Sequence, residues 1–297
     1  MAGVGAEGVC LRIKLISPAG WILMKPNLII THPGSAHFDE VTAISLILAV
    51  NASGHYIVER REPTGSELDD PNVWVVDVGN RHEPSKHNFD HHQSTECPAA
   101  FVLVADYLGL KDTLSVMPWW DFKDSVDRIG PRRSSVQFNA GDDLVNRNPV
   151  EIWLTASFAA SPENALPLLE DFGTRLIEDA RLLRRQIDFW KSCPRVTIAG
   201  VPAVIGETHE SAGLEEFRRL DDNPPDIVIS LDRPDNGWRL FRYDGAPVDF
   251  SRISDRPEVA FAHANGFLAK TKARLGMDEL VSLVSQAITQ PSAGNRK

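Results

Sequence analysis

The chain has 297 residues, of which 42% are hydrophobic and 24% are charged, and its formal net charge is −10. These proportions are typical of an ordinary globular protein, so they exclude disorder, coiled coil and collagen as the main state of the chain. The length predicts about two domains, at roughly 150 residues each. No apolar run reaches the roughly 18 residues that a membrane-spanning helix needs, and the acidic total argues against a protein that coats nucleic acid through bulk charge.

The cysteines and the N-terminus suggest where the protein works. The three cysteines, Cys10, Cys97 and Cys193, lie far apart and form neither a disulfide framework nor a Cys-x-x-Cys metal site. Residues 1–23 lack the charged, apolar and small-residue regions of a secretory signal. We therefore expect a reducing, cytoplasmic location without membrane contact, and an N-terminal extension over 1–23. Met24, directly before the first predicted strand, is a candidate start of the native protein.

The first part of the chain alternates predicted strands and helices. Short β-branched or apolar runs predict strands at 27–31, 56–59 and 72–78. Helical spacing of apolar residues predicts helices from Asp39 onward and at about 98–109, 114–129 and 149–160. Such alternation is typical of a doubly wound, mainly parallel sheet. In sheets of this kind, ligands bind beyond the carboxyl ends of the strands.

A long Arg-rich helix and a change of pattern follow. Ser161 and Pro162 are suited to the N-cap and the first turn of a helix that continues to Cys193 and ends before Pro194. Beyond it, the sequence predicts a hairpin, further short strands and a final helix over 278–288. We therefore expect an α/β domain over 24–193, which ends in a connecting helix, and a second, smaller α/β domain over 194–297.

The histidines are crowded into one region. Seven of the nine lie between positions 32 and 92. The segment THPGSAHFDE, at 31–40, places His32, His37 and Asp39 between a strand and a helix. Asp77 lies at the end of the apolar run VVDVG, and Asp90, His91 and His92 follow in NFDHHQ.

A lone histidine near a strand end is usually an inert polar residue, but this combination indicates a metal centre. A charged Asp77 in an apolar run is costly unless a cation or several donors satisfy it. Imidazoles with carboxylates, and no thiolate, suit Mn²⁺, Fe, Co²⁺ or Zn²⁺ better than Ca²⁺ or Mg²⁺ alone. One Asp between two clusters could bridge two metals, as in phosphoryl-transfer sites.

These motifs resemble a known family. Asp90-His91-His92 is the motif that names the DHH phosphoesterase superfamily. THPGSAHFDE and VVDVGN…FDHHQ are similar to the corresponding motifs of its melanocyte-proliferating-gene (MYG) branch. More weakly, DSVDRIG at 124–130, GWRLFRYDG and VAFAHANGFLAKT at 259–271 are similar to later MYG segments. The resemblance covers about residues 25–272.

The resemblance implies a DHH phosphoesterase-like fold with a dinuclear centre, and manganese is the first expectation for its two divalent ions. It implies that Asp77 bridges the ions and that Asp127, with Asp124 as the alternative, is the ligand from the DSVDRIG segment. His92 would contact the phosphate and protonate the leaving group, and Asp90 would orient a neighbouring imidazole. The six implied ligands are His32, His37, Asp39, Asp77, His91 and Asp127.

Two departures from the family pattern concern substrate binding. Arg128-Ile129 replaces the Asn-Gly that follows the family's aspartate, and Leu268-Ala269-Lys270 replaces its tandem glycines. Arg128, Arg132 and Arg133 form a basic cluster that suits phosphate. The predicted substrate-binding residues are Arg128, Arg133, His263, Gly266 and Lys270.

The implied function is a metal-dependent hydrolase of phosphodiester bonds, acting as a 3′–5′ exonuclease on RNA or short oligonucleotides. One alternative keeps the site but changes the substrate to a small phosphate compound such as pyrophosphate or a dinucleotide. Another, from the altered motifs, is a non-catalytic scaffold with a degenerate metal site.

Overall fold

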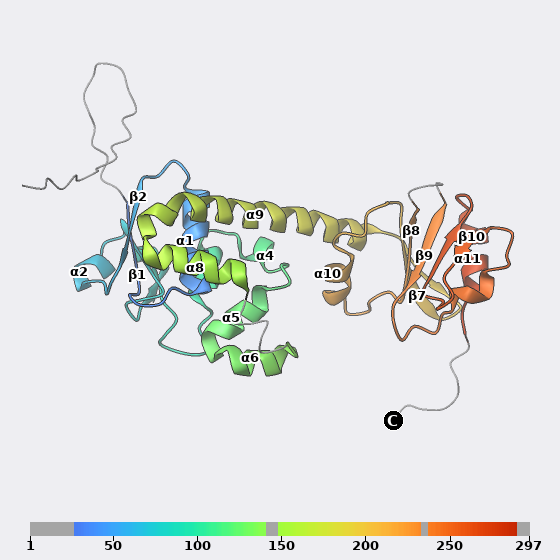
Figure 1. The fold of residues 1–297 in the computed structure, drawn as a ribbon, viewed down its shortest axis with the longest axis horizontal. Helices are drawn as coiled ribbons and strands as arrows, with labels where there is room; N and C mark the ends of the chain where they lie inside the picture. Colours follow the sequence, from blue (N-terminus) through green and yellow to red (C-terminus); the bar gives the residue numbers. More distant parts are fainter. Residues whose placement is uncertain (1–26, 141–147, 233–236, 290–297) are drawn as a thin grey trace, which may run out of the picture.

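A computed structural model describes residues 27–140, 148–232 and 237–289, and Figure 1 shows two β-sheets connected by one long helix. The first sheet has the strand order β2-β1-β3-β5-β4. Its pairs β1–β2, β1–β3 and β3–β5 are parallel, and β4 alone is antiparallel to its neighbour. The predicted α/β class with a mainly parallel sheet is therefore confirmed. The expected extension over 1–23 lies outside the described residues.

The strands of the first sheet agree closely with the apolar runs in the sequence. The predicted strand 27–31 is found unchanged as β1, while β3 is shorter than the predicted 72–78 because the chain turns at Asp77. The five strands are β1 (Asn27–Thr31), β2 (Tyr56–Arg60), β3 (Val73–Val76), β4 (His82–Glu83) and β5 (Asn88–Phe89).

Helix α1 (Phe38–Val50) lies at the centre of the first core. Every residue from Asp39 to Leu48 is buried, which is expected of a helix that is covered on all sides. Asp39 and Glu40 lie in its first turn, where negative charge complements the helix dipole. The start of α1 therefore brings two buried carboxylates to the carboxyl end of β1.

The helix predicted over 114–129 is wrong at 115–119, which are not helical, while its remainder is found over Trp120–Ile129. Pro118, which lacks the backbone donor and clashes with a preceding turn, lies in the part that is not helical. The remaining helices of this part are α2 (Gly65–Leu68), α3 (Ala100–Tyr107), α4 (Lys111–Leu114), α5 (Trp120–Ile129), α6 (Pro131–Phe138), α8 (Pro149–Ala160) and α9 (Pro162–Ser192).

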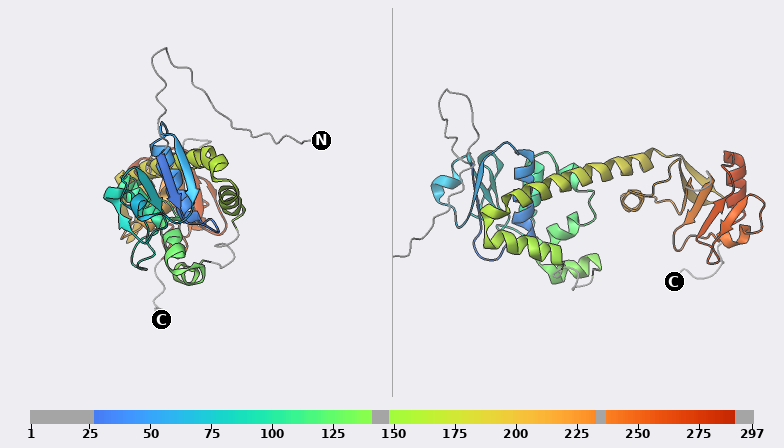
Figure 2. Two further views of the ribbon diagram at one scale, coloured as in Figure 1. Left: turned by 90° about the vertical axis from the view of Figure 1, so that its left-hand side faces the viewer. Right: turned by 45° about the horizontal axis from the view of Figure 1, so that its top comes forward.

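Helix α9 packs against α1 and continues to the second sheet, as the right-hand view in Figure 2 shows. The two helices touch at Gly173. A Cβ atom at this position would lie 2.1 Å from the backbone oxygen of Ser45. Glycine is therefore required by the close approach of the helices.

The second sheet is mainly antiparallel and has its own core, which includes Ile229, Leu240 and Leu283. The predicted hairpin after Pro194 is confirmed as β6 and β7, but the two strands after position 258 were not predicted. The elements are β6 (Arg195–Ile198), β7 (Val201–Gly206), α10 (Leu214–Arg219), β8 (Ile227–Leu231), β9 (Trp238–Arg242), β10 (Val259–Ala262), β11 (Leu268–Thr271) and α11 (Met277–Ser285). The proposed division into domains 24–193 and 194–297 stays a prediction.

Within the described ranges, no helix is both long enough and apolar enough to cross a bilayer. Even α9 carries charged residues along its length.

Candidate metal centre

Three segments that the sequence singled out meet at the carboxyl ends of the parallel strands β1, β3 and β5. The loop after β1 leads into α1 and carries His32 and His37. Asp77 follows β3 directly, and Asp90-His91-His92 follows β5. Because these strands are neighbours in the sheet, the three segments converge although up to 60 residues separate them in sequence.

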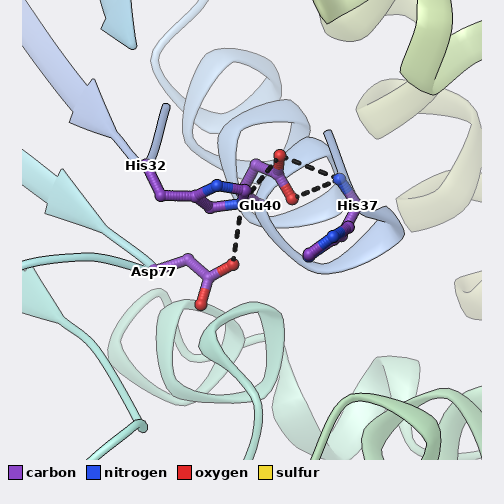
Figure 3. Close-up of side chains that lie close together, drawn as sticks. All are labelled: His32, His37, Glu40 and Asp77. Carbon is purple, nitrogen blue, oxygen red and sulfur yellow. Dashed lines mark hydrogen bonds and ion pairs between the residues drawn. The ribbon is translucent and has the colours of Figure 1, made fainter. Parts of the chain in front are cut away.

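The first group of side chains surrounds His32, as Figure 3 shows. The Nε2 atom of His32 lies 3.2 Å from Glu40 Oε1 and 3.6 Å from Asp77 Oδ2. The ring of His37 lies 5.0 Å from that of His32, measured between centroids. One ligand atom from each of His32, His37, Glu40 and Asp77 lies within 4.8 Å of the others.

Backbone contacts hold this first group in place. The backbone N–H of His37 donates to the Glu40 carboxylate, at 2.9 and 2.8 Å to its two oxygens. This contact is half of a capping box and fixes both residues at the start of α1. His32 Nδ1 lies 2.9 Å from the carbonyl oxygen of Pro33. If Nδ1 carries the proton, Nε2 presents its lone pair toward Asp77.

The second group is centred on His91. Its Nε2 atom lies 2.6 Å from Asp127 Oδ2, 3.3 Å from Asp77 Oδ1 and 3.4 Å from Asp39 Oδ2. Ligand atoms of Asp39, Asp77, His91 and Asp127 lie within 4.8 Å of one another. Asp77 is therefore shared by both groups, one on each side of its carboxylate.

Asp124 and Asp127, the two aspartates of the DSVDRIG segment, have different contacts. Asp127 reaches His91 from helix α5. Asp124, one turn earlier, accepts a hydrogen bond from the Ala99 backbone and pairs with Arg128 at 3.2 Å. Only Asp127 of the two therefore lies in the cluster.

Asp90 lies behind the cluster and contacts His92. Its Oδ1 atom accepts from the backbone N–H of His92 at 3.0 Å and lies 2.7 Å from His92 Nδ1, while Oδ2 accepts from the Asn80 backbone at 2.6 Å. Asp90 is buried, whereas 59% of the His92 side chain is exposed. Asp90 thus orients an imidazole that faces solvent.

The crowding of charges shifts the pKa values of the cluster. Burial by itself lowers the pKa of His91, but the adjacent Asp127 and Asp77 carboxylates raise it to about 10. The Glu40 carboxylate is the main reason that the pKa of His32 rises to about 9. Burial, together with neighbouring carboxylates, raises the pKa of Asp39 well above its usual value, and burial raises that of Asp77. The two imidazoles therefore retain protons that a divalent cation could displace.

The unpartnered atoms of the cluster fit a metal centre. His32 Nε2, His91 Nε2 and Asp77 Oδ1 are buried and have no partner in hydrogen-bond geometry, although carboxylate oxygens lie close to each ring nitrogen. Buried polar atoms normally have such partners. Nitrogen and oxygen atoms that converge without bonding each other are expected where a cation lies between them. The donor set suits Mn²⁺, Fe, Co²⁺ or Zn²⁺.

The predicted substrate-binding residues do not join the cluster as a group. Arg128 pairs with Asp124 and donates to the Thr95 carbonyl at 3.2 Å, and Arg133 is exposed on α6. His263, Gly266 and Lys270 lie at or between β10 and β11, in the second sheet, and Figure 1 shows β10 at the opposite end of α9 from β1.

Their expected role as an anion site is not favoured by their local contacts. Lys270 is 2.8 Å from Asp232, so its charge is already paired. The Asp249 carboxylate lies so close to Gly266 that a Cβ added to the glycine would clash with it. A negative charge therefore already lies next to this glycine.

Glu40 and Arg60 are members of the site that sequence reasoning missed. Glu40 is fully buried next to His32, and Arg60 Nη2 lies 3.8 Å from Glu40 Oε1. Arg60 ends β2, opposite Thr31 in the parallel register. For Arg60, the sequence signal was its position at the carboxyl end of a strand next to β1. For Glu40, the signal was its spacing of three residues from His37.

Comparisons with known proteins agree with the motifs THPGSAHFDE and NFDHHQ. A family model named MYG1_exonuc and described as "Uncharacterised protein family (UPF0160)" matches residues 28–99. The chain is 42% identical to the MYG1 exonuclease of Rattus norvegicus over 74 residues, which are 25% of this chain and 19% of that protein. It is 36% identical to the MYG1 protein of Chlamydia trachomatis over 86 residues, which are 28% of this chain and 29% of that protein. The matches thus span less than a third of the length of these relatives.

Two solved structures are also similar, at low identity. A pGpG-specific phosphodiesterase, PggH from Vibrio cholerae, has 12% identity and a TM-score of 0.31, covering 88% of this chain and 99% of its own. RecJ from Thermus thermophilus has 13% identity and a TM-score of 0.26, covering 88% of this chain and 49% of its own. Over residues 28–99, which contain five of the six predicted metal ligands, the chain is therefore similar to the MYG1 family, as its motifs predicted.

Proposed function

We propose that this protein is a metal-dependent phosphoesterase that hydrolyses phosphodiester bonds. The observation that carries the proposal is the pair of ligand groups that share the buried carboxylate of Asp77. Two-metal centres of this kind stabilise both the attacking and the leaving oxygen of a phosphoryl displacement. The relatives named exonuclease support the same class of reaction.

Different residues of the site would bind the metal ions, position the ligands and transfer the proton. His32, His37 and Asp77 would hold one ion, and Asp39, Asp77, His91 and Asp127 the other. Bound there, divalent ions would polarise the phosphate and lower the pKa of the attacking water. Glu40 keeps His32 and His37 in place through its contacts with both. His92, oriented by Asp90, would hydrogen-bond the phosphate and donate a proton to the leaving oxygen.

We further propose Mn²⁺ as the activating ion and RNA or short oligonucleotides as substrates, degraded from the 3′ end. The donor set supports Mn²⁺ among the ions it suits. The net charge of −10 favours short substrates over long polyanions. That same charge supports the alternative of a small phosphate compound, such as pyrophosphate or a dinucleotide.

The test is an assay of purified protein with Mn²⁺ on end-labelled RNA and DNA oligonucleotides, dinucleotides and pyrophosphate. We expect release of mononucleotides from the 3′ end of RNA. Asp127→Asn should lower kcat by a factor of about 10² or more, because it removes a charged group from the reacting centre. Asp121→Asn is the matched control, since Asp121 is exposed on the same helix and should leave kcat unchanged.

Each other outcome has a defined meaning. Cleavage of pyrophosphate or dinucleotides alone would support the small-substrate alternative. Inactivity on every substrate, with Mn²⁺ bound, would favour a non-catalytic scaffold. Equal effects of Asp127→Asn and Asp121→Asn would contradict the assignment of the cluster as the reacting centre.

A further inference from the structure

A cavity of about 480 Å³ adjoins the metal-binding cluster on its α5 side. It shares His37, Asp39 and Asp127 with the cluster, and side chains of α5 and α8 form much of its remaining wall. Figure 1 shows α8 beside α1 and α5, and both α5 and α8 contact α1. None of the wall residues from α8 was among the predicted site residues.

The charges of the cavity do not suit a phosphate group. Lys123 is the one lysine or arginine among the described lining residues, and its Nζ atom lies 2.5 Å from Glu151 Oε2. The two side chains are only 13% and 20% exposed, so this pair is screened little by solvent. With Lys123 paired to Glu151, no lysine or arginine among the described lining residues is left to bind an anion. A phosphate group would therefore bind where divalent ions occupy the cluster, and an uncharged group in the cavity.

The remaining wall suits a largely apolar group. Phe38, Val126 and Ile152 line the cavity, and its volume is at the lower end of the roughly 300–1,000 Å³ of small-molecule sites. Lys123 and Glu151 add one donor and one acceptor at its edge. A nucleobase presents apolar faces together with donors and acceptors along its rim.

We propose that this cavity binds one nucleobase of the substrate while the adjoining phosphate lies at the cluster. The inference rests on the proposed function and narrows it: the substrate is a nucleotide ester, and pyrophosphate is a poor substrate because it leaves the cavity unfilled. The second sheet is not needed for this contact.

The test fills the cavity from its rim. Ile152 is 52% exposed, so Ile152→Trp adds bulk at the rim without disturbing the core. Val150→Trp is the matched control, because Val150 lies on the same helix, is 64% exposed and does not line the cavity. Binding of the four nucleoside monophosphates and of ribose 5-phosphate is measured by calorimetry in the presence of Mn²⁺, for the wild type and both variants.

We expect the wild type to bind at least one nucleoside monophosphate about tenfold or more tightly than ribose 5-phosphate, as loss of a base contact predicts. Ile152→Trp should remove this preference, and Val150→Trp should keep it. Equal binding of all five compounds by the wild type, or a preference that survives Ile152→Trp, would overturn the inference even if the enzyme cleaves RNA. A preference that Ile152→Trp removes, in a protein that cleaves no phosphodiester, would instead support the cavity and overturn the proposed function.

Discussion

Asp77 combines a strained backbone with a buried charge. Its φ is 57°, in the left-handed region that costs most residues other than glycine of the order of 1–3 kcal/mol. This conformation ends β3 and directs the carboxylate between His32 and His91, at 3.6 and 3.3 Å. Strain of this kind persists where the surroundings require it, and here the requirement is the shared position between the two ligand groups.

The sequence alone predicted the shared role of Asp77 but not the role of Glu40. A lone acid in an apolar strand stands out because its burial is costly. Glu40 follows Asp39 directly in the sequence. Which of these two adjacent acids faces the site depends on the orientation of the first turn of α1, and the sequence does not give that orientation. Both are buried, but Asp39 accepts from the backbone N–H groups of Ala100 and Phe101 as well as facing His91. That tertiary contact is not visible in a local pattern.

The raised pKa values of His32 and His91 predict how stability depends on pH. A histidine near its ordinary pKa of 6.5 in the unfolded chain, and near 9 or 10 in the native protein, binds protons more tightly when folded. The stability that it contributes is fully present below about pH 6.5 and is lost as pH rises toward 9–10. We expect the free energy of unfolding, measured with urea in EDTA, to fall across this range.

Variants and metal separate this effect from general alkaline instability. His91→Gln should flatten the fall, whereas His55→Gln, at an exposed position outside the cluster, should not. With Mn²⁺ the trend should reverse, since binding displaces protons and strengthens with pH. Stability in EDTA that is constant or rises between pH 6.5 and 9 would show that these imidazoles are not paired with carboxylates.

At the scale of elements, the predictions succeeded where one physical signal dominated. The apolar run of β1 and the helical spacing of α8 gave the observed bounds. Burial of both faces of β1 explains its continuous apolar run, and α8 buries one face through Leu154 and Phe158. The helix predicted over 114–129 failed because its apolar spacing continued across Pro118. Strand β10 was missed because its exposed positions, such as Phe261 at 46%, do not alternate with buried ones in the usual pattern. Strand β11 does alternate, but it is only four residues long.

The contact between α1 and α9 gives a prediction about stability. Gly173→Ala should destabilise the protein by about 1–3 kcal/mol, since the added Cβ would overlap the Ser45 backbone and force the helices apart. In most helices the same change is stabilising. Gly65→Ala is the control, because a Cβ there meets nothing within 4 Å. Urea denaturation measures both, and equal stability of the two variants would contradict the close packing.

At the scale of the whole molecule, the fold places the cluster entirely in the first part of the chain. From the sequence we expected His263, Gly266 and Lys270, which lie in the second sheet, to complete the site, because the family motifs continue there. The order of motifs along the chain does not determine how far apart they lie in space, however. In the described residues, the cores of the two sheets are largely separate. Two of the predicted substrate-binding cations are partly neutralised, Arg128 by Asp124 and Lys270 by Asp232.

The overall charge therefore predicts the response to substrate length and salt. A protein that neutralises six to ten phosphates loses roughly 10³–10⁵ in affinity between about 50 and 200 mM salt. A chain with a net charge of −10, in which Arg128 and Lys270 are already paired with carboxylates, has few such contacts to lose. We expect kcat/KM with Mn²⁺ to change by less than about tenfold over this range, and to gain little between a dinucleotide and an oligonucleotide of about 20 residues. A steep fall with salt, seen only for the longer substrate, would instead reveal a basic path along the chain, and Arg133→Ala should then reduce its slope.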